Sequence, residues 1–226
     1  MTIKQISDAG LIQFNVINQS ALSLMQNSVR TLAKKGETIN VDKIPLNDDP
    51  TYKLLSTGTA PNSIIPDNKN YQATLKTVQP CRIEELCAVI AMHQPRFQKN
   101  ISAYIERKQF SDSVSYCHPA LKKYTEETYG LLLYQEQIIQ ITHELSGLSL
   151  AQGDLLRRAI QKPNHEQVEV YKTKFLNGAA NSGLPRADAL TIFEYMADSG
   201  KSCFNKSHAI AYSIIAYQAA WLKLRE

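Results

Sequence analysis

Residues 204–212 read Phe204-Asn205-Lys206-Ser207-His208-Ala209-Ile210-Ala211-Tyr212. The stretch opens a long apolar segment that continues to Leu224, with hydrophobic side chains at positions all round a helix. Such a helix needs cover from the rest of the protein on most of its sides. We therefore predict a mostly α-helical chain packed around a helix at 206–224.

The start of this predicted helix has the residue types of an anion site. Asn205 suits the N-cap position, where a side-chain oxygen accepts a hydrogen bond from the first turn. The free N–H groups of that turn attract an anion, and Lys206 and His208 would add positive charge beside the hydroxyl of Ser207. Because a lysine there is unfavourable for the helix dipole, its placement suggests a function. The alternative is an asparagine cap with incidental neighbours.

A second cationic group lies on a helix predicted over 149–161. Arg157 and Arg158 follow each other there, and Lys162 comes just after the helix ends. If two of these cations face one surface, they form a pocket for a triphosphate or a nucleic-acid backbone. The alternative is a solvated helix face on which Asp154 pairs with Arg158 at i,i+4 spacing.

The bulk composition is that of a globular protein. The chain has 226 residues, 43% of them hydrophobic and 20% charged, which is enough for one domain or two small ones. The net charge of +4 is a mild basic bias, compatible with an anionic partner such as DNA. No segment has the character of a signal peptide or a membrane span, so we expect a cytoplasmic protein without a membrane partner.

Familiar metal and catalytic motifs are missing from the sequence. The cysteines form no Cys-x-x-Cys pair and have no metal-like spacing with histidine, so we expect reduced thiols and no bound metal. P-loop, G-x-G-x-x-G and G-x-S-x-G patterns are also absent. Glu136, in the run Tyr134-Gln135-Glu136-Gln137, fits a structural role better than a catalytic one. The cysteines are Cys81, Cys87, Cys117 and Cys203.

Hydrophobic periodicity and capping residues predict the other elements. Residues 10–17 alternate imperfectly and are rich in β-formers, which predicts a short strand. An amphipathic helix is expected over 20–33, and a short one from a cap at Asp48 or Asp49 through Leu55. Further helices are predicted near 71–78, 82–92, 100–108, 130–146, 149–161, 165–181, 185–198 and 206–224, with caps at Ser149, Asn164 and Asn205.

Three stretches share an order and a spacing that are specific. They are residues 128–137 (Thr-Tyr-Gly-Leu-Leu-Leu-Tyr-Gln-Glu-Gln), residues 155–159 (Leu-Leu-Arg-Arg-Ala) and residues 204–212. Together they resemble the fingers region of the bacterial DNA polymerase III alpha subunit family, over about Gly10 to Leu224. The resemblance implies a partial palm-like segment at 1–60 and a fingers-like helical domain at 61–226. It also implies nucleotide- or phosphate-binding roles for Arg157, Arg158, Lys162, Asn205, Lys206, Ser207 and His208.

The same resemblance exposes a departure at a residue needed for catalysis. The family transfers nucleotides to a DNA 3′ end with two Mg²⁺ ions held by palm aspartates, two of which lie upstream of the matched region. The third belongs to a motif resembling Gly-Leu-Val-Lys-Phe-Asp-Phe-Leu-Gly-Leu. Here Gln13 stands at the lysine position and Asn15 at the aspartate position. Because a neutral amide is a poor Mg²⁺ ligand, we expect an incomplete metal site and no catalytic residue.

Other polar positions of the family pattern differ as well, while the apolar framework is retained. This fits a chain selected to fold but not to polymerise. The family's Phe-Gln-Leu-Glu-Ser is Ile64-Ile65-Pro66-Asp67-Asn68, its Arg-Pro-Gly-Pro is Gln94-Pro95-Arg96-Phe97, and its Gly-Lys-Lys is Gln161-Lys162-Pro163.

Functions of different classes follow from these observations. The first is a catalytically inactive polymerase-derived module that still binds DNA, a nucleoside triphosphate or a replication protein, as a regulator or decoy. The second is a fragment of a split DNA polymerase, active only with a separate palm-bearing chain. Asn15 argues against the second, because even a completed palm would lack one carboxylate. A remnant without function is a third interpretation.

Overall fold

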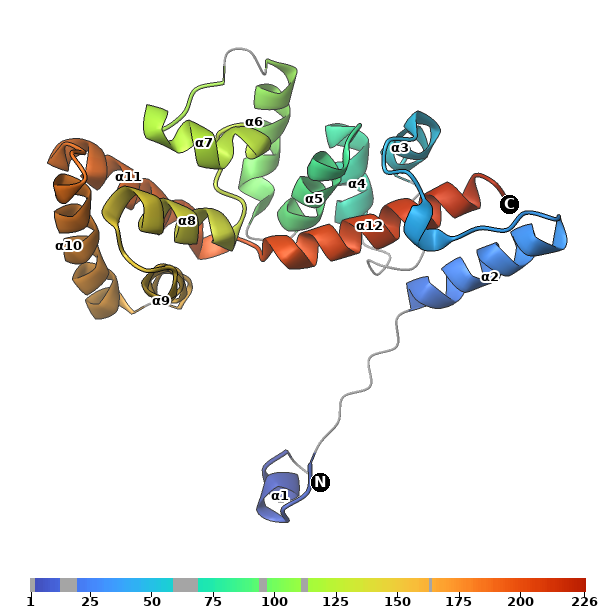
Figure 1. Ribbon diagram of the computed structural model, residues 1–226, viewed down its shortest axis with the longest axis horizontal. Helices are drawn as coiled ribbons and strands as arrows, with labels where there is room; N and C mark the ends of the chain where they lie inside the picture. The colour runs from blue at the N-terminus through green and yellow to red at the C-terminus, as the bar shows by residue number, and fades with distance from the viewer. Residues whose placement is uncertain (1–2, 13–19, 59–68, 94–96, 111–113, 163) are drawn as a thin grey trace.

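The computed structural model describes residues 3–12, 20–58, 69–93, 97–110, 114–162 and 164–226 (Figure 1). These ranges are mostly helical, which confirms the predicted fold class. No strand occurs within them, and the β pairing seen there is an isolated parallel bridge between Tyr134 and Phe204. None of the helices in these ranges is both long and apolar enough to cross a membrane.

Most of the helices lie close to their predicted positions, whereas those at 3–8 and 122–125 were not predicted. The α-helices are α1 (Ile3–Asp8), α2 (Ser20–Lys34), α3 (Asp49–Ser56), α4 (Lys69–Val78), α5 (Ile83–Met92), α6 (Gln98–Gln109), α7 (Lys122–Thr125), α8 (Gln135–Ser146), α9 (Leu150–Gln161), α10 (His165–Asn181), α11 (Arg186–Ser199) and α12 (Lys206–Lys223). Short 3₁₀ turns complete the path: η1 (Val41–Lys43), η4 (Pro119–Leu121), η5 (Glu126–Thr128) and η6 (Gly200–Ser202).

The predicted caps form and fix where several helices begin. The side chain of Asp48 accepts the Thr51 N–H at 3.1 Å and starts α3. Ser149 and Gln152 bond reciprocally, a capping box that starts α9. The side chains of Asn164 and Asn205 cap α10 and α12, and each accepts the N–H of the residue three positions further along the chain. Each cap satisfies a backbone donor that has no partner inside the helix.

The predicted strand at 10–17 is not seen. Its first residues instead close helix α1: Gly10 has φ of 68°, and the Leu11 N–H donates to the Ile6 carbonyl at 3.1 Å. That arrangement is a common way for a helix to end at a glycine. Residues 13–17, which include Asn15, lie outside the described residues.

The predicted helix at 130–146 begins five residues late, at Gln135. The preceding run, 130–134, is buried and non-helical, and successive side chains of an extended chain point to opposite sides. Leu131 and Leu133 enter one hydrophobic core, whereas Leu132 enters another. Two cores on either side of the run therefore override its helical propensity.

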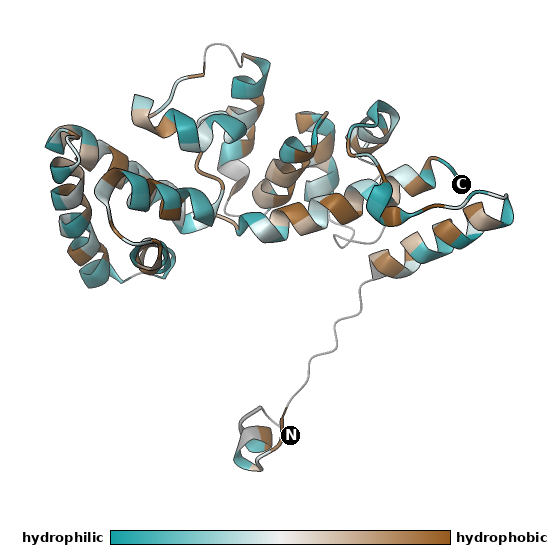
Figure 2. Cartoon of the chain, viewed as in Figure 1, coloured by the Kyte–Doolittle hydropathy of each residue, from teal (hydrophilic) through white to brown (hydrophobic). Residues whose placement is uncertain are grey.

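These two cores divide the described helices into two lobes. The first lobe consists of α2 to α6 and α12, and the second of α7 to α11 with the turns η4, η5 and η6. In Figure 1, α8 to α11 gather at one end of the molecule, and α2 to α5 lie along α12 at the other. Hydrophobic residues recur along the length of α12 in Figure 2, as expected for a helix with neighbours on several sides. A domain division near residue 60 stays a prediction.

The buried run 130–134 takes much of its hydrogen bonding from side chains and from a distant segment. The N–H groups of Leu133 and Tyr134 both donate to Oε1 of Gln137 at 2.9 Å. The carbonyl of Leu133 accepts the N–H of Phe204 at 2.8 Å. Because a buried backbone group without a partner is costly, these bonds fix where the run can lie.

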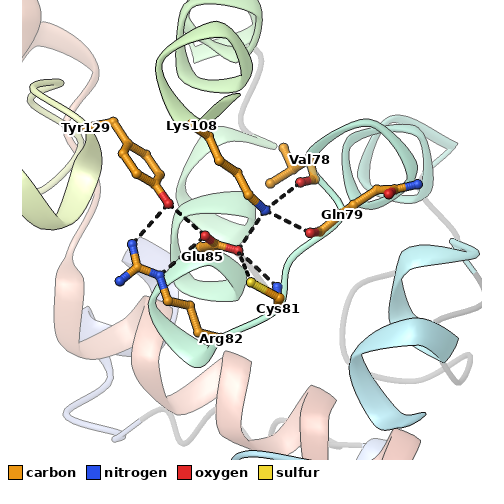
Figure 3. Close-up of polar contacts among 7 residues, drawn as sticks. All are labelled: Val78, Gln79, Cys81, Arg82, Glu85, Lys108 and Tyr129. Carbon is orange, nitrogen blue, oxygen red and sulfur yellow. Dashed lines mark hydrogen bonds and ion pairs between the residues drawn. The ribbon is translucent and has the colours of Figure 1, made fainter. Parts of the chain in front are cut away.

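A buried carboxylate joins the elements of the first lobe (Figure 3). Glu85 on α5 is 2% exposed, and its oxygens accept from Nζ of Lys108 at 2.8 Å and from the hydroxyl of Tyr129 at 2.7 Å. Nε of Arg82 and the N–H of Cys81 also donate to it, at 3.3 and 2.9 Å. A buried charge requires such compensation, so α5, α6 and the turn at Tyr129 are held together.

These partners set the charge state of Glu85. Burial alone would raise its pKa, but hydrogen bonds from Lys108, Cys81 and Tyr129, with the charge of Lys108, bring the pKa below the ordinary 4.5. The carboxylate form therefore stabilises the folded state above about pH 4.5. That contribution is lost as the pH falls through the folded-state pKa.

A close crossing of α8 and α10 in the second lobe requires glycine. A Cβ added to Gly178 would lie 2.0 Å from the carbonyl oxygen of Ser146. The obstacle is backbone and cannot rotate away as a side chain could. The two helices therefore approach each other at a distance that no other residue permits.

We expect Gly178→Ala to destabilise the protein by at least about 1–3 kcal/mol, the usual cost of overpacking. This sign is opposite to the advantage that alanine normally has over glycine inside a helix. Urea unfolding followed by circular dichroism measures the difference. Asn177→Ala, on the exposed side of the same turn, serves as the control and should be nearly neutral. Unchanged or increased stability of Gly178→Ala would show that the crossing is not tight.

We expect Glu85→Gln to lower the free energy of unfolding by about 3 kcal/mol at pH 7, because it leaves Lys108 and Arg82 without their buried counter-charge. The variant should also lose less stability than the wild type between pH 6 and pH 3 (about one carboxylate's share of the slope). Chemical denaturation across that range checks both effects. Glu106→Gln, at an exposed site on α6, should leave the curve unchanged. Parallel pH profiles for wild type and Glu85→Gln would contradict the assignment.

Candidate phosphate-binding site

The three cations predicted on α9 line one surface pocket. Arg157, Arg158 and Lys162, together with Gln161, surround an open space of about 320 Å³ at the C-terminal end of the helix. Cations are favoured there because the carbonyl end of a helix carries partial negative charge. The helix dipole thus stabilises the positive charge of the pocket without any ligand.

Asp154, one turn earlier, shares its carboxylate between the two arginines. Arg157 contacts it through two nitrogens, and Nε of Arg158 lies 2.8 Å from its second oxygen. Burial pulls the pKa of Asp154 upward, but the hydrogen bonds and charges of the arginines outweigh it, and the pKa lies below the ordinary 3.8. The predicted alternative, an Asp154–Arg158 pair, therefore forms on the same face as the pocket.

The two arginines differ in how freely they meet solvent. The Arg157 side chain is only 16% exposed and also donates to Oε1 of Gln161 at 3.1 Å. The Arg158 side chain is 64% exposed, and Lys162 is exposed as well. Arg158 and Lys162 are therefore the cations best placed to reach a phosphate, whereas Arg157 is largely engaged within the protein.

The anion site predicted at the start of α12 is filled by the protein itself. The carboxylate of Glu136 accepts the Lys206 N–H at 2.9 Å and Nδ2 of Asn205 at 3.1 Å. Nζ of Lys206 donates to Glu127 at 2.6 Å and lies over the ring of Tyr134, 5.5 Å from its centroid. The site thus has the predicted chemistry, with carboxylates from α8 and η5 as its anions.

Ser207 and His208 are exposed at the same helix start. The imidazole of His208 lies among aromatic rings, 4.3 Å from the centroid of Tyr212 and 5.5 Å from that of Phe204. These tilted and edge-to-face ring contacts place the imidazole beside Tyr212 and Phe204. The hydroxyl of Ser207 and this ring remain open to a ligand in solvent.

Hydrogen bonds link the α9 pocket to the start of α12. Nε2 of Gln161 donates to the Cys203 carbonyl at 2.8 Å, and Nε2 of Gln135 donates to the same oxygen at 3.2 Å. Cys203 lies two residues before the Asn205 cap. These hydrogen bonds connect the two predicted cationic groups indirectly, through Gln161 and the Cys203 carbonyl.

The sequence interpretation missed the partners of the α12 site. Glu136 was assigned a structural role, which its contacts fit, but its place on the predicted anion site was not foreseen. Glu127 was not singled out at all. The unfavourable lysine in the first turn was the available signal, because a carboxylate nearby is the simplest compensation for it.

In the part of the chain that the structure describes, no group of three or more His, Cys, Asp and Glu side chains is placed to hold a metal ion. The family's aspartate position, Asn15, lies outside the described residues and offers a neutral amide.

Comparison with known proteins identifies the family. The family model for the bacterial DNA polymerase III alpha subunit finger domain matches residues 20–183. The DNA polymerase III subunit alpha of Caulobacter vibrioides (strain NA1000 / CB15N) is 36% identical over 221 residues, covering 98% of this chain and 19% of that protein.

Two further relatives carry the same name. The protein of Halalkalibacterium halodurans is 34% identical over 223 residues, covering 98% of this chain and 20% of its own length. That of Thermus aquaticus is 34% identical over 220 residues, covering 95% and 18%. The chain spans about a fifth of the length of these relatives. With most of the chain matched by the family model, it belongs to the bacterial DNA polymerase III alpha subunit finger-domain family.

Proposed function

We propose that this chain is a catalytically inactive relative of DNA polymerase III alpha that keeps weak binding to the phosphates of DNA or of a nucleoside triphosphate. Asn15 is the observation that carries the inactivity, because it replaces a metal-binding carboxylate with an amide. A regulator or decoy acting in the cytoplasm on replication is the role that fits these properties.

The α9 pocket is the part of the site that supports binding. Arg157, Arg158 and Lys162 bring three positive charges, and Asp154 offsets one of them. A net positive pocket with two exposed cations attracts phosphate groups in a salt-dependent manner. The start of α12 supports binding less, since Glu127 and Glu136 already hold its donors. A ligand there would have to displace these carboxylates.

The alternative is a fragment of a split polymerase that acts with a palm-bearing chain. The family membership is compatible with it, but Asn15 would leave the joint metal site short of one carboxylate. The two proposals differ in a simple outcome. Addition of a palm-bearing chain would produce nucleotide transfer only if the split enzyme is correct.

We expect the chain to show no nucleotide transfer on primed DNA with Mg²⁺ and all four nucleoside triphosphates. Asn15→Asp alone should remain inactive, because one carboxylate cannot hold two metal ions. Primer extension resolved on a denaturing gel measures this, with protein cleared of contaminating polymerase. Extension above background by the wild type would refute the proposed inactivity.

We expect wild-type binding to fluorescein-labelled primed DNA to weaken with salt, with a slope of log affinity against log salt of roughly −3. The double variant Arg158→Ala/Lys162→Ala should flatten that slope by about two contacts. Its thermal midpoint should hardly change, because exposed cations contribute little to stability. Fluorescence anisotropy and thermal unfolding provide the two readouts.

The double variant Lys122→Ala/Lys123→Ala is the matched control, since it removes two exposed lysines from α7, away from the pocket. Its slope of log affinity against log salt should stay close to that of the wild type. Arg157 is kept intact because its buried contacts would confuse stability with binding. Equal slopes for both double variants would reject the α9 pocket as the binding surface.

A further inference from the structure

The two lobes are joined by a small number of chain crossings. The chain passes between them along the connection from α6 to η4, at 129–134 and at 203–205. Helix packing runs mainly within each lobe, and between lobes it is carried by η5 against α5. The hydrogen bonds between lobes gather at the last two crossings. Each lobe therefore has its own core, and the shared interface is narrow.

At the crossing over 129–134, adjacent residues are held by opposite lobes. Tyr129 belongs to the first lobe: its ring lies 5.2 Å from that of Tyr104, and its carbonyl accepts from Arg107 at 3.1 Å. The next carbonyl, that of Gly130, accepts from the hydroxyl of Tyr195 in the second lobe at 3.0 Å. Both residues have positive φ, 51° and 80°. For tyrosine this is an uncommon conformation, which the neighbouring contacts maintain.

At the crossing over 203–205, adjacent residues are again held by opposite lobes. Cys203 is buried in the second core, and its carbonyl accepts from Gln161 of α9. Phe204, the next residue, packs against the first core. The N–H of Phe204 donates to Leu133, and Gln135 donates to the Phe204 carbonyl, both at 2.8 Å. These bonds hold the two crossings side by side, which gives them a common axis.

From this geometry we propose that residues Tyr129–Gly130 and Cys203–Phe204 form a hinge between the lobes. The two lobes rotate as rigid bodies about an axis through these residues. Domain hinges are a few residues at element ends that absorb changes of φ and ψ, while packed cores on either side stay intact. The contact between Lys206 and Glu127, 2.6 Å long and partly exposed, acts as the latch of the arrangement seen here. It joins α12 of the first lobe to η5 of the second.

Rotation about the hinge would move the two cationic groups relative to each other. The α9 pocket lies in the second lobe, whereas Asn205 to His208 start α12 of the first. Rotation changes their separation, so an anion that contacts both groups would favour one arrangement of the lobes. The hinge itself does not depend on phosphate binding.

Pulsed electron paramagnetic resonance on the full chain tests the hinge. Nitroxide labels go on Ala73→Cys in α4 and Ala180→Cys in α10, both exposed, with Cys81→Ser and Cys117→Ser removing the exposed native thiols. Lys206→Met should raise the population of a second inter-lobe distance by about two- to fivefold, the scale of a partly exposed ion pair. Glu127→Gln should do the same from the opposite lobe, and high salt should do so in the wild type.

Lys201→Met is the matched control, because Lys201 pairs with Asp198 within the second lobe. It should leave the distance distribution unchanged. One unaltered distance in both latch variants, with circular dichroism showing them folded, would overturn the hinge. Unfolding of both variants would overturn it too, because the pair would then be part of one cooperative core and not a latch.

Discussion

The fold depends on the requirement that the buried run 130–134 find partners for its backbone. Gln137 accepts two hydrogen bonds with one side chain, and Phe204 supplies a third from more than seventy positions along the chain. Meeting this requirement places the start of α8 beside the start of α12. Glu136 then reaches the first turn of α12, and Gln135 reaches Cys203. The candidate site and the narrow joint between the lobes are both consequences of this arrangement.

Carboxylates accompany the cations that the sequence singles out. Asp154 serves the arginines of α9, and Glu127 and Glu136 serve the start of α12. In the first lobe, Glu85 does the same for Lys108. Several of these cations are thus paired within the protein, and the proposed phosphate binding would rely on the charges left exposed, chiefly those of Arg158 and Lys162. Such a design suits a weak, reversible partner better than a tightly held one.

Local interactions made much of the fold predictable from sequence. Ser149, Asn164 and Asn205 cap helices because a cap involves only a few consecutive residues. The predicted start of the helix at 130–146 was wrong, because the burial of Leu131 to Tyr134 between two cores is a tertiary effect. For the candidate site, the sequence identifies the residue types but not which side chains are free to meet a ligand. The sequence identifies Arg157 as a cation, but only the structure shows that its side chain is mostly buried and bound to Asp154.

The packing of α12 against α2 and α5 has a consequence for synthesis on the ribosome. The second lobe, from η4 to η6, is continuous in sequence and interrupts the first, whose helix α12 is made only after the second lobe. The interrupting lobe can fold as soon as it has emerged, whereas α2 to α5 must wait for α12 to cover their apolar faces. During that interval these faces are open to chaperones or to misassembly. The order of the helices thus leaves the apolar faces of α2 to α5 uncovered until α12 has been made.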